Sequence, residues 1–197
     1  RLRLVAYSAP SSVTAVAALP MALFVPAFYA DDLGVPLAAV GVAIACSRLL
    51  DVVTDPLIGG LSDRMHLPLG RRKPWMLLGA PIFLIALWKI FVPSDDVSAV
   101  YLAVWSAVLY LGFTLIDLPH KAWGAELSTD YDERSRVTGW REGIATAGQV
   151  TLLAAVVWLA ARGIEDAAGQ LKAIAVAIVI ALPVLLLMCV STVAERI

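Results

Sequence analysis

Three ionisable residues lie close together in one long apolar segment of the sequence: Arg48, Asp51 and Asp55. Offsets of three and seven residues place all three side chains on one face of a helix, and Thr54 borders that face. An ionised side chain at the centre of a bilayer costs about 2.5–3.5 kcal/mol on insertion scales, so such residues usually mark an ion or substrate pathway. We therefore predict a functional site on this helix face.

Two interpretations of this cluster are open. In the first, Arg48 and Asp51 form a buried ion pair that fixes helix packing, and Asp55 still needs a cation, a proton or a partner from another helix. In the second, the carboxylates of Asp51 and Asp55 and the hydroxyl of Thr54 surround a sodium ion, because hard oxygen ligands suit hard cations. A desolvated carboxylate can also take up a proton near neutral pH, so the same site suits either ion.

A second cluster lies in another apolar segment and contains Thr114, Asp117, His120 and Lys121. Asp117 and Lys121 are four residues apart and can pair along one helix face, with Thr114 on the same side. One interpretation is a solute or ion site; the other is that Lys121 simply neutralises Asp117. His120 at this depth is a candidate proton relay within the same charge network as Arg48.

The segments that carry these residues are long enough to cross a membrane. The chain has 197 residues, of which 60% are hydrophobic, and its mean hydropathy is +0.84. A membrane helix needs about 20 mostly apolar residues. Six ranges meet this requirement and predict an all-α membrane protein: 5–29, 37–61, 75–92, 97–123, 137–161 and 171–193.

Charge and cysteine content exclude several other classes. The net charge of −1 gives no basis for nucleic-acid binding. Cys46 and Cys189 both lie in apolar runs and suit buried side chains rather than a disulfide or metal framework. We also expect the chain, which begins with Arg1, to be part of a longer protein without a cleavable signal peptide.

The connections between the six ranges sort by charge. One set holds most of the cations: Arg1, Arg3, Arg64, Arg71, Arg72, Lys73, Arg134, Arg136 and Arg196. The other set holds mainly acidic residues, with two cations near the last loop: Asp31, Asp32, Asp95, Asp96, Glu165, Asp166, Arg162 and Lys172. The positive-inside rule then predicts that both ends of the chain lie in the cytoplasm of a cell whose plasma (inner) membrane it spans.

The loop after the second range carries a motif of its own. It reads Gly60-x-x-Asp63-Arg64 and then Gly70-Arg71-Arg72. Positive-inside topology explains the charge of this loop but not its spacing. Charge-assisted bonds between Asp63 and the basic residues are expected to hold one conformation of a transporter.

These motifs resemble the major facilitator superfamily, and within it the glycoside-pentoside-hexuronide:cation symporter family, which includes the melibiose permeases. The resemblance covers about residues 29–141 and rests on the loop motif, on its long spacer, and on three further patterns. The residues that match these patterns are Arg48, Asp51, Asp55 and Pro56; Asp117 and Pro119; and Glu126, Asp130, Tyr131, Glu133, Arg134 and Arg141.

The resemblance implies a fold and a site. The fold is a 3+3 inverted repeat of six helices that forms the amino-terminal half of a twelve-helix transporter, whose carboxy-terminal half is absent from this chain. The implied cation site consists of Asp51, Thr54, Asp55 and Thr114. The implied solute cavity contains Asp117, Arg141 and the position of Lys121, with Arg48 organising the charges.

Two positions depart from the melibiose permeases. Ala15 stands where their first helix supplies an aspartate, and Lys121 stands where a stacking aromatic residue is expected. A cationic Lys121 suits an acidic sugar or an amphiphile with an anionic head.

The expected function is sodium- or proton-coupled symport of a sugar, glycoside or sugar acid. Its expected partners are the solute, membrane lipid and the missing half, with no cofactor besides the coupling ion. Symport of a lysolipid-like amphiphile is the first alternative. The others are an aspartate-rich lipid-head-group transferase that uses Asp51, Asp55 and Asp63, and a non-transporting scaffold. The sequence leaves the coupling ion, the solute, the direction of transport and the oligomeric state open.

Overall fold

The computed structural model describes residues 2–65, 70–94, 97–128 and 130–195. Six helical spans in this part of the chain are long and apolar enough to cross a membrane, which confirms the predicted all-α membrane fold. The first span, Leu4–Asp32, is built from α1, the short α2 and the π-helical turn η1. The elements are α1 (Leu2–Leu23), α2 (Val25–Ala27), η1 (Phe28–Asp32), α3 (Leu37–Arg64), α4 (Lys73–Phe91), α5 (Ala99–Glu126), α6 (Tyr131–Ala161) and α7 (Ala167–Thr192). The charged residues Arg1, Asp95, Asp96 and Arg196 of the topology argument lie outside the described residues.

Several helices extend beyond the apolar ranges because backbone hydrogen bonding continues where hydropathy falls. Helix α6, which forms the fifth membrane span, begins at Tyr131 rather than near 137. The Asp130 carboxylate accepts the N–H of Glu133 at 3.0 Å and satisfies one of the free donors of the first turn. Ser98 caps α5 in the same way through the N–H of Tyr101, at 3.1 Å. The Asp130 cap therefore lets α6 begin before its apolar range.

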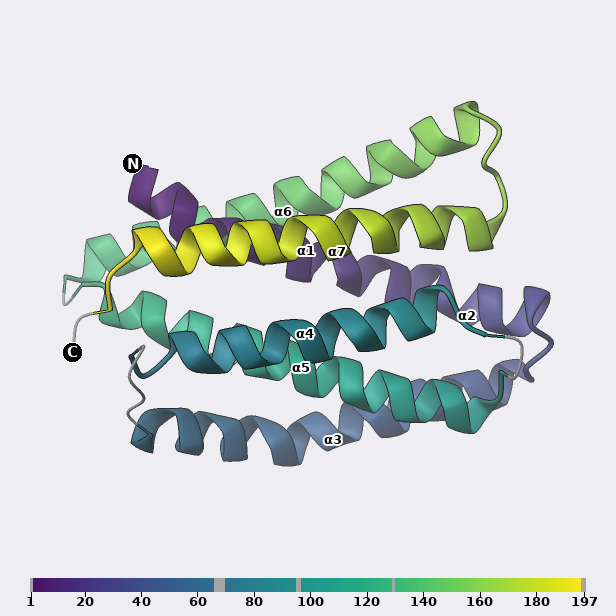
Figure 1. Ribbon diagram of the computed structural model, residues 1–197, viewed down its shortest axis with the longest axis horizontal. Coiled ribbons are helices and arrows are strands. Elements are labelled where there is room, and N and C mark those ends of the chain that lie inside the picture. The colour runs from purple at the N-terminus through teal and green to yellow at the C-terminus, as the bar shows by residue number, and fades with distance from the viewer. Residues whose placement is uncertain (1, 66–69, 95–96, 129, 196–197) are drawn as a thin grey trace.

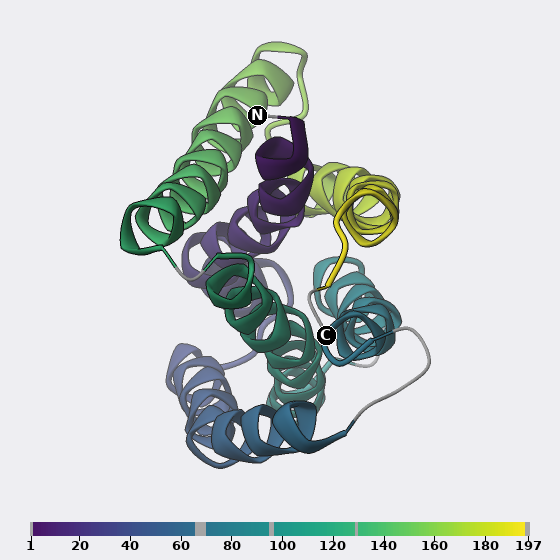
Figure 2. The ribbon, with the colours of Figure 1, turned by 90° about the vertical axis from the view of Figure 1, so that its left-hand side faces the viewer.

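The helices pack as two matching groups of three (Figures 1 and 2). In the first group, α5 packs against α3 and α4. In the second group, α1 packs against α6 and α7. Contacts between α4 and α7 and between α1 and α5 join the groups. Exchanging α1 with α5, α3 with α6 and α4 with α7 reproduces the four main contacts within the groups and the two contacts between them named above. The members of each exchanged pair run in opposite directions (Figure 1), as a 3+3 inverted repeat requires.

Glycines allow the closest helix contacts. A Cβ atom on Gly112 of α5 would lie 2.6 Å from the backbone N of Phe83 in α4. A Cβ atom on Gly148 of α6 would lie 2.8 Å from the carbonyl oxygen of Ser12 in α1. Small residues at crossings are how membrane helices gain packing energy, since lipid tails are as apolar as the helix surfaces. These two crossings set the distances of α5 and α6 from their neighbours.

Both ends of the described chain lie at the same end of the bundle (Figure 1). The motif loop between α3 and α4 and the connection between α5 and α6 lie at that end as well. The polar network around Arg72, described below, lies at this end and joins segments that are far apart in sequence.

Candidate functional site

The carboxylates of α3 lie at its interface with α5. The hydroxyl of Thr114 in α5 donates a hydrogen bond to Oδ1 of Asp55 at 3.0 Å. One turn earlier in α3, Asp51 lies close enough to Asp55 for their charges to interact. The helix therefore brings two carboxylates and the hydroxyl of a second helix into one region.

Two oxygens in this region have no protein partner. Among the described residues, Oδ1 of Asp51 and Oγ1 of Thr54 are buried and make no hydrogen bond. Both residues line a cavity of about 170 Å³ between α3 and α5. Leaving a buried polar group unsatisfied costs about 1–3 kcal/mol, and more when the group is charged. A bound cation or proton would remove that cost, so these oxygens fit the expected cation set.

The oxygen set itself limits what this region can bind. Within the described part of the chain, no three side chains of His, Cys, Asp or Glu gather as metal ligands. Ligands for an ion here are therefore two carboxylates with neighbouring hydroxyls. Oxygen ligands of this kind suit hard cations.

Arg48 is held by α5 instead of by Asp51. Its Nε donates to the hydroxyl of Tyr110 at 3.0 Å, and its guanidinium lies 4.7 Å from the centre of the Tyr110 ring. No ion pair joins Arg48 to Asp51 within the described residues, although their charges interact at longer range. Both line a cavity of about 80 Å³ bounded by α1, α3, α4 and α5. The interpretation as a simple packing ion pair is therefore not supported.

The expected solute residues lie on α5 and α6. Nζ of Lys121 contacts Oδ2 of Asp117 at 2.6 Å, with Lys121 half exposed and Asp117 mostly covered. On α6, Nη2 of Arg141 contacts Oε1 of Glu142 at 2.6 Å, and the Arg141 side chain is only 13% exposed. Both carboxylate partners reduce the net positive charge available to a solute. The structure also places Arg141 beside the hydroxyl of Tyr7 in α1.

His120 faces α1. Its Nε2 lies 2.8 Å from the carbonyl oxygen of Tyr7, and its Nδ1 lies 3.5 Å from the hydroxyl of Ser11. The side chain is buried in the contact between α1 and α5. Both of these bonds connect His120 to α1. The expected role of His120 in the charge network of Arg48 stays a prediction.

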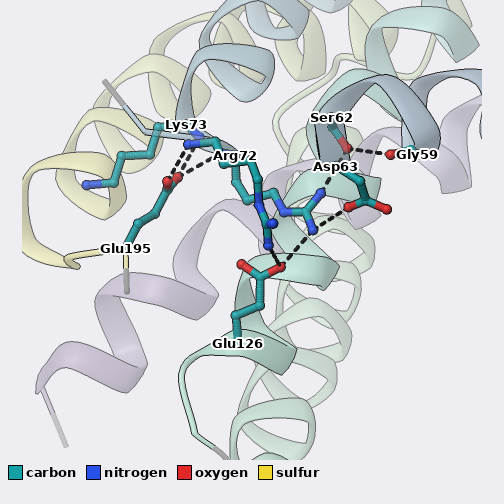
Figure 3. A network of polar contacts seen from close by, with 8 residues as sticks. Gly59, Ser62, Asp63, Arg72, Lys73, Glu126 and Glu195 are labelled. Atoms are coloured by element: carbon teal, nitrogen blue, oxygen red, sulfur yellow. Dashed lines mark hydrogen bonds and ion pairs between the residues drawn. The ribbon is translucent and has the colours of Figure 1, made fainter. Parts of the chain in front are cut away.

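The motif loop forms an ion-pair network with Arg72 at its centre (Figure 3). Nη2 of Arg72 contacts Oδ1 of Asp63 at 2.6 Å and Oε1 of Glu126 at 2.7 Å. Nη1 of Arg72 donates to the hydroxyl of Ser62 at 2.9 Å, and Arg71 shares Glu126 at 2.6 Å. Burial alone would lower the pKa of Arg72, but its bonds to Glu126 and Asp63 more than offset this and raise the pKa above its usual value. The network therefore keeps a buried, charged guanidinium that ties α3 and α5 to the start of α4.

Glu195, beyond the end of α7, completes this network (Figure 3). Its Oε2 accepts the backbone N–H of Arg71 at 2.6 Å. Its Oε1 accepts those of Arg72 at 3.0 Å and Lys73 at 2.8 Å. A carboxylate at the N-terminus of a helix satisfies free N–H groups and complements the helix dipole. The segment after α7 is thereby fixed to α4.

The remaining motif residues have different surroundings. Gly70 has φ +114°, a conformation that favours glycine, and a Cβ atom there would overlap the Glu195 carboxylate. A Cβ atom on Gly60 would meet nothing within 4 Å in the described chain. Arg64 is the exposed last residue of α3.

Comparison with known proteins agrees with the fold and the motifs. The sequence profile of the family described as MFS/sugar transport protein matches residues 6–196. The chain belongs to the major facilitator superfamily. Within it, the similar proteins place the chain in the glycoside-pentoside-hexuronide:cation symporter family.

Three relatives illustrate the range of this family. An uncharacterised symporter of Synechocystis is 32% identical over 174 residues, which are 84% of this chain and 32% of that protein. The inner membrane symporter YicJ of Escherichia coli is 32% identical over 129 residues, or 64% of this chain and 28% of that protein. The sodium-dependent lysophosphatidylcholine symporter 1 of Xenopus tropicalis is 29% identical over 148 residues, or 72% of this chain and 27% of that protein. The chain therefore spans about a third of the length of the curated relatives it matches.

Sequence reasoning missed several partners of the family motifs. Tyr110 lies four residues before Thr114 on the same helix face, so its contact with Arg48 had a local signal. The partners Tyr7 and Glu195 had no local signal in the sequence. Each lies more than a hundred residues from the residue that it contacts, His120 and Arg71 respectively.

Proposed function

We propose that the complete protein is a secondary transporter that couples a sodium ion or a proton to the symport of a sugar, glycoside or sugar acid. The observation that carries this proposal is the oxygen set between α3 and α5. The carboxylate of Asp55 is bonded to Thr114, while oxygens of Asp51 and Thr54 are buried without a partner. Such a set is unfavourable unless an ion or a proton joins it.

The family supports the general activity. Both bacterial relatives reported above are named symporters, and one is named for the inner membrane. We propose the same location for this protein. Both ends of the chain would then face the cytoplasm, because the motif loop at that end of the bundle carries Arg71, Arg72 and Lys73.

The solute would lie against Asp117, Lys121 and Arg141. Lys121 and Arg141 are each paired with a carboxylate, and a solute that carries hydroxyl groups or a carboxylate can exchange hydrogen bonds with both partners of such pairs. The second half of the cavity would come from the other half of the transporter. Membrane lipid would surround the remaining surface.

A lysolipid-like amphiphile is the second candidate solute, because one relative is named as a lysophosphatidylcholine symporter. The name of that relative also specifies sodium dependence. The transferase alternative has less support, because Asp63 is engaged by Arg72 at 2.6 Å and does not join Asp51 and Asp55.

Uptake by the full-length protein in proteoliposomes tests the proposal. Neutral sugars, sugar acids and lysolipids are offered with sodium and pH gradients imposed separately. We expect one solute class to accumulate under one gradient, and we expect Asp55→Cys to abolish accumulation while expression is retained. Asp132→Cys, which changes an exposed carboxylate in the first turn of α6, is the matched control. Normal accumulation by Asp55→Cys would refute the assignment of the cation site.

A further inference from the structure

Tyr7 of α1 and His120 of α5 form a reciprocal pair. The hydroxyl of Tyr7 donates to the backbone carbonyl of His120 at 2.6 Å. The ring of His120 in turn reaches the backbone carbonyl of Tyr7 through Nε2 at 2.8 Å. The two rings also pack together, with centroids 4.4 Å apart. Each side chain is thus bonded to the main chain of the other helix.

The pair fixes a proton on one nitrogen of the imidazole. A carbonyl oxygen only accepts, so Nε2 carries a proton and donates to Tyr7, while Nδ1 shares a hydrogen bond with the hydroxyl of Ser11. Both ring nitrogens of His120 are therefore occupied by α1. An imidazole with both nitrogens bonded to α1 suits a structural bond better than a proton relay.

The surroundings hold the pair in one position. Tyr7 is 1% exposed and His120 is 2% exposed. The Tyr7 ring fills the space beside Gly124, where a Cβ atom would overlap the Tyr7 hydroxyl. Trp123 meets the Tyr7 ring edge to face at 5.9 Å, and Cys189 of α7 points its thiol at the Tyr7 carbonyl. Both side chains are therefore enclosed by residues of α5 and α7.

The pair lies next to the residues expected to contact the solute. His120 stands between Asp117 and Lys121 in the sequence of α5, so a rotation of α5 that breaks its bonds also moves that ion pair. The hydroxyl of Tyr7 lies beside Arg141 of α6 and within electrostatic reach of Asp117. A single pair of side chains thus touches the helices that carry all three candidate solute residues.

We propose that Tyr7 and His120 are positioning residues that hold the Asp117–Lys121 pair and Arg141 in the geometry that binds the solute. The inference rests on the proposed symport function. It assigns no role to the pair in binding the cation, whose candidate ligands lie on α3 and at Thr114.

Kinetics of the full-length protein test this inference through two constants measured separately. Removing one of these buried bonds in Tyr7→Phe or His120→Leu is expected to raise the KM for the transported solute about tenfold. The cation concentration for half-maximal activation should change less than twofold. His120→Gln should stay near the wild-type KM, because the amide Nε2 also donates to the Tyr7 carbonyl.

A steric variant provides a matched comparison. Gly124→Ala should displace the Tyr7 ring and raise the solute KM as Tyr7→Phe does, whereas Gly143→Ala should not, because a Cβ atom on Gly143 meets nothing within 4 Å. Equal loss of solute and cation affinity, or reduced protein amount with unchanged constants, would mean that the pair only supports the fold and would overturn the inference.

Two outcomes separate this inference from the proposed function. If Asp55→Cys is inactive while Tyr7→Phe and His120→Leu keep a normal solute KM, the inference fails and the function stands. If the wild type accumulates none of the offered solutes under either gradient, the proposed function fails, and the inference, which rests on it, fails with it.

Discussion

The bond between Glu195 and the start of α4 gives the sharpest prediction about the fold. Glu195→Gln keeps the size of the side chain but removes its charge and one of its two acceptor oxygens. The carboxylate now accepts three backbone N–H groups, those of Arg71, Arg72 and Lys73. An amide retains one carbonyl oxygen and directs an N–H₂ group toward at least one of these donors, so at most two bonds remain.

The size of the effect follows from these contacts. A hydrogen bond to a charged group contributes about 1.5–3 kcal/mol. A negative charge at a helix N-terminus adds about 0.3–1 kcal/mol. Glu195 is only partly buried, so solvent recovers some of this energy. We expect a loss of about 2 kcal/mol in the local stability of the loop, which is a factor of roughly thirty in the equilibrium for opening it.

Amide hydrogen exchange on the full-length protein measures the equilibrium for opening the loop at the three N–H groups that Glu195 binds. The backbone N–H groups of residues 71–73 should exchange about thirtyfold faster in Glu195→Gln than in the wild type. The start of α6, capped by Asp130, provides an internal reference that should not change. Glu165→Gln, an exposed glutamate in the loop before α7, is the matched control variant.

Unchanged exchange at residues 71–73 in Glu195→Gln would refute the reasoning. It would mean that the carboxylate of Glu195 does not contribute to the stability of the N-terminus of α4. Faster exchange at the start of α6 as well would indicate a general loss of stability rather than the loss of this contact.

Two further predictions concern the interfaces of α5. Thr114→Val removes the hydroxyl that donates to Asp55 and should raise the cation concentration for half-maximal transport about five- to tenfold, whereas an unchanged value would exclude Thr114 from the site. Gly112→Ala places a Cβ atom 2.6 Å from the backbone N of Phe83 and should lower the melting temperature of the purified protein by several degrees, corresponding to roughly 1–3 kcal/mol. The same substitution at Gly143, where the space is open, should be neutral or stabilising, and equal effects at both sites would contradict the packing argument.

The fold was predictable because membrane helices carry their signal locally. Six apolar ranges of sufficient length identify six spans without any long-range information. The ends of the helices were less predictable. The start of α6 at Tyr131, for example, lies in polar sequence and depends on the Asp130 cap. Local spacing also predicted the pairing of Asp117 with Lys121, which the structure contains at 2.6 Å.

The partners of the candidate site were less accessible to sequence reasoning. The spacing of Arg48 and Asp51 on one helix face suggested a pair, but Arg48 bonds to Tyr110, 62 residues further along the chain. His120 looked like a candidate proton relay from its depth, but its partner Tyr7 comes from a helix 113 residues away. Periodicity identifies the face of a helix that is buried; it does not identify which helix covers that face. The roles of the site residues in binding remain predictions.

The arrangement of the two helix groups has a consequence for energetic coupling. The candidate cation ligands lie mainly on α3, and Arg141 lies on α6, yet among the described residues α3 and α6 share no extensive contact. Within this chain, free energy passed between an ion on α3 and a solute on α6 has to pass through other helices, among them α5, which contacts α3, α1 and α6. The contact between α1 and α5, where Tyr7 and His120 meet, lies on one such route. A substitution there can therefore weaken the coupling between ion and solute in addition to weakening solute binding, while leaving the cation ligands in place.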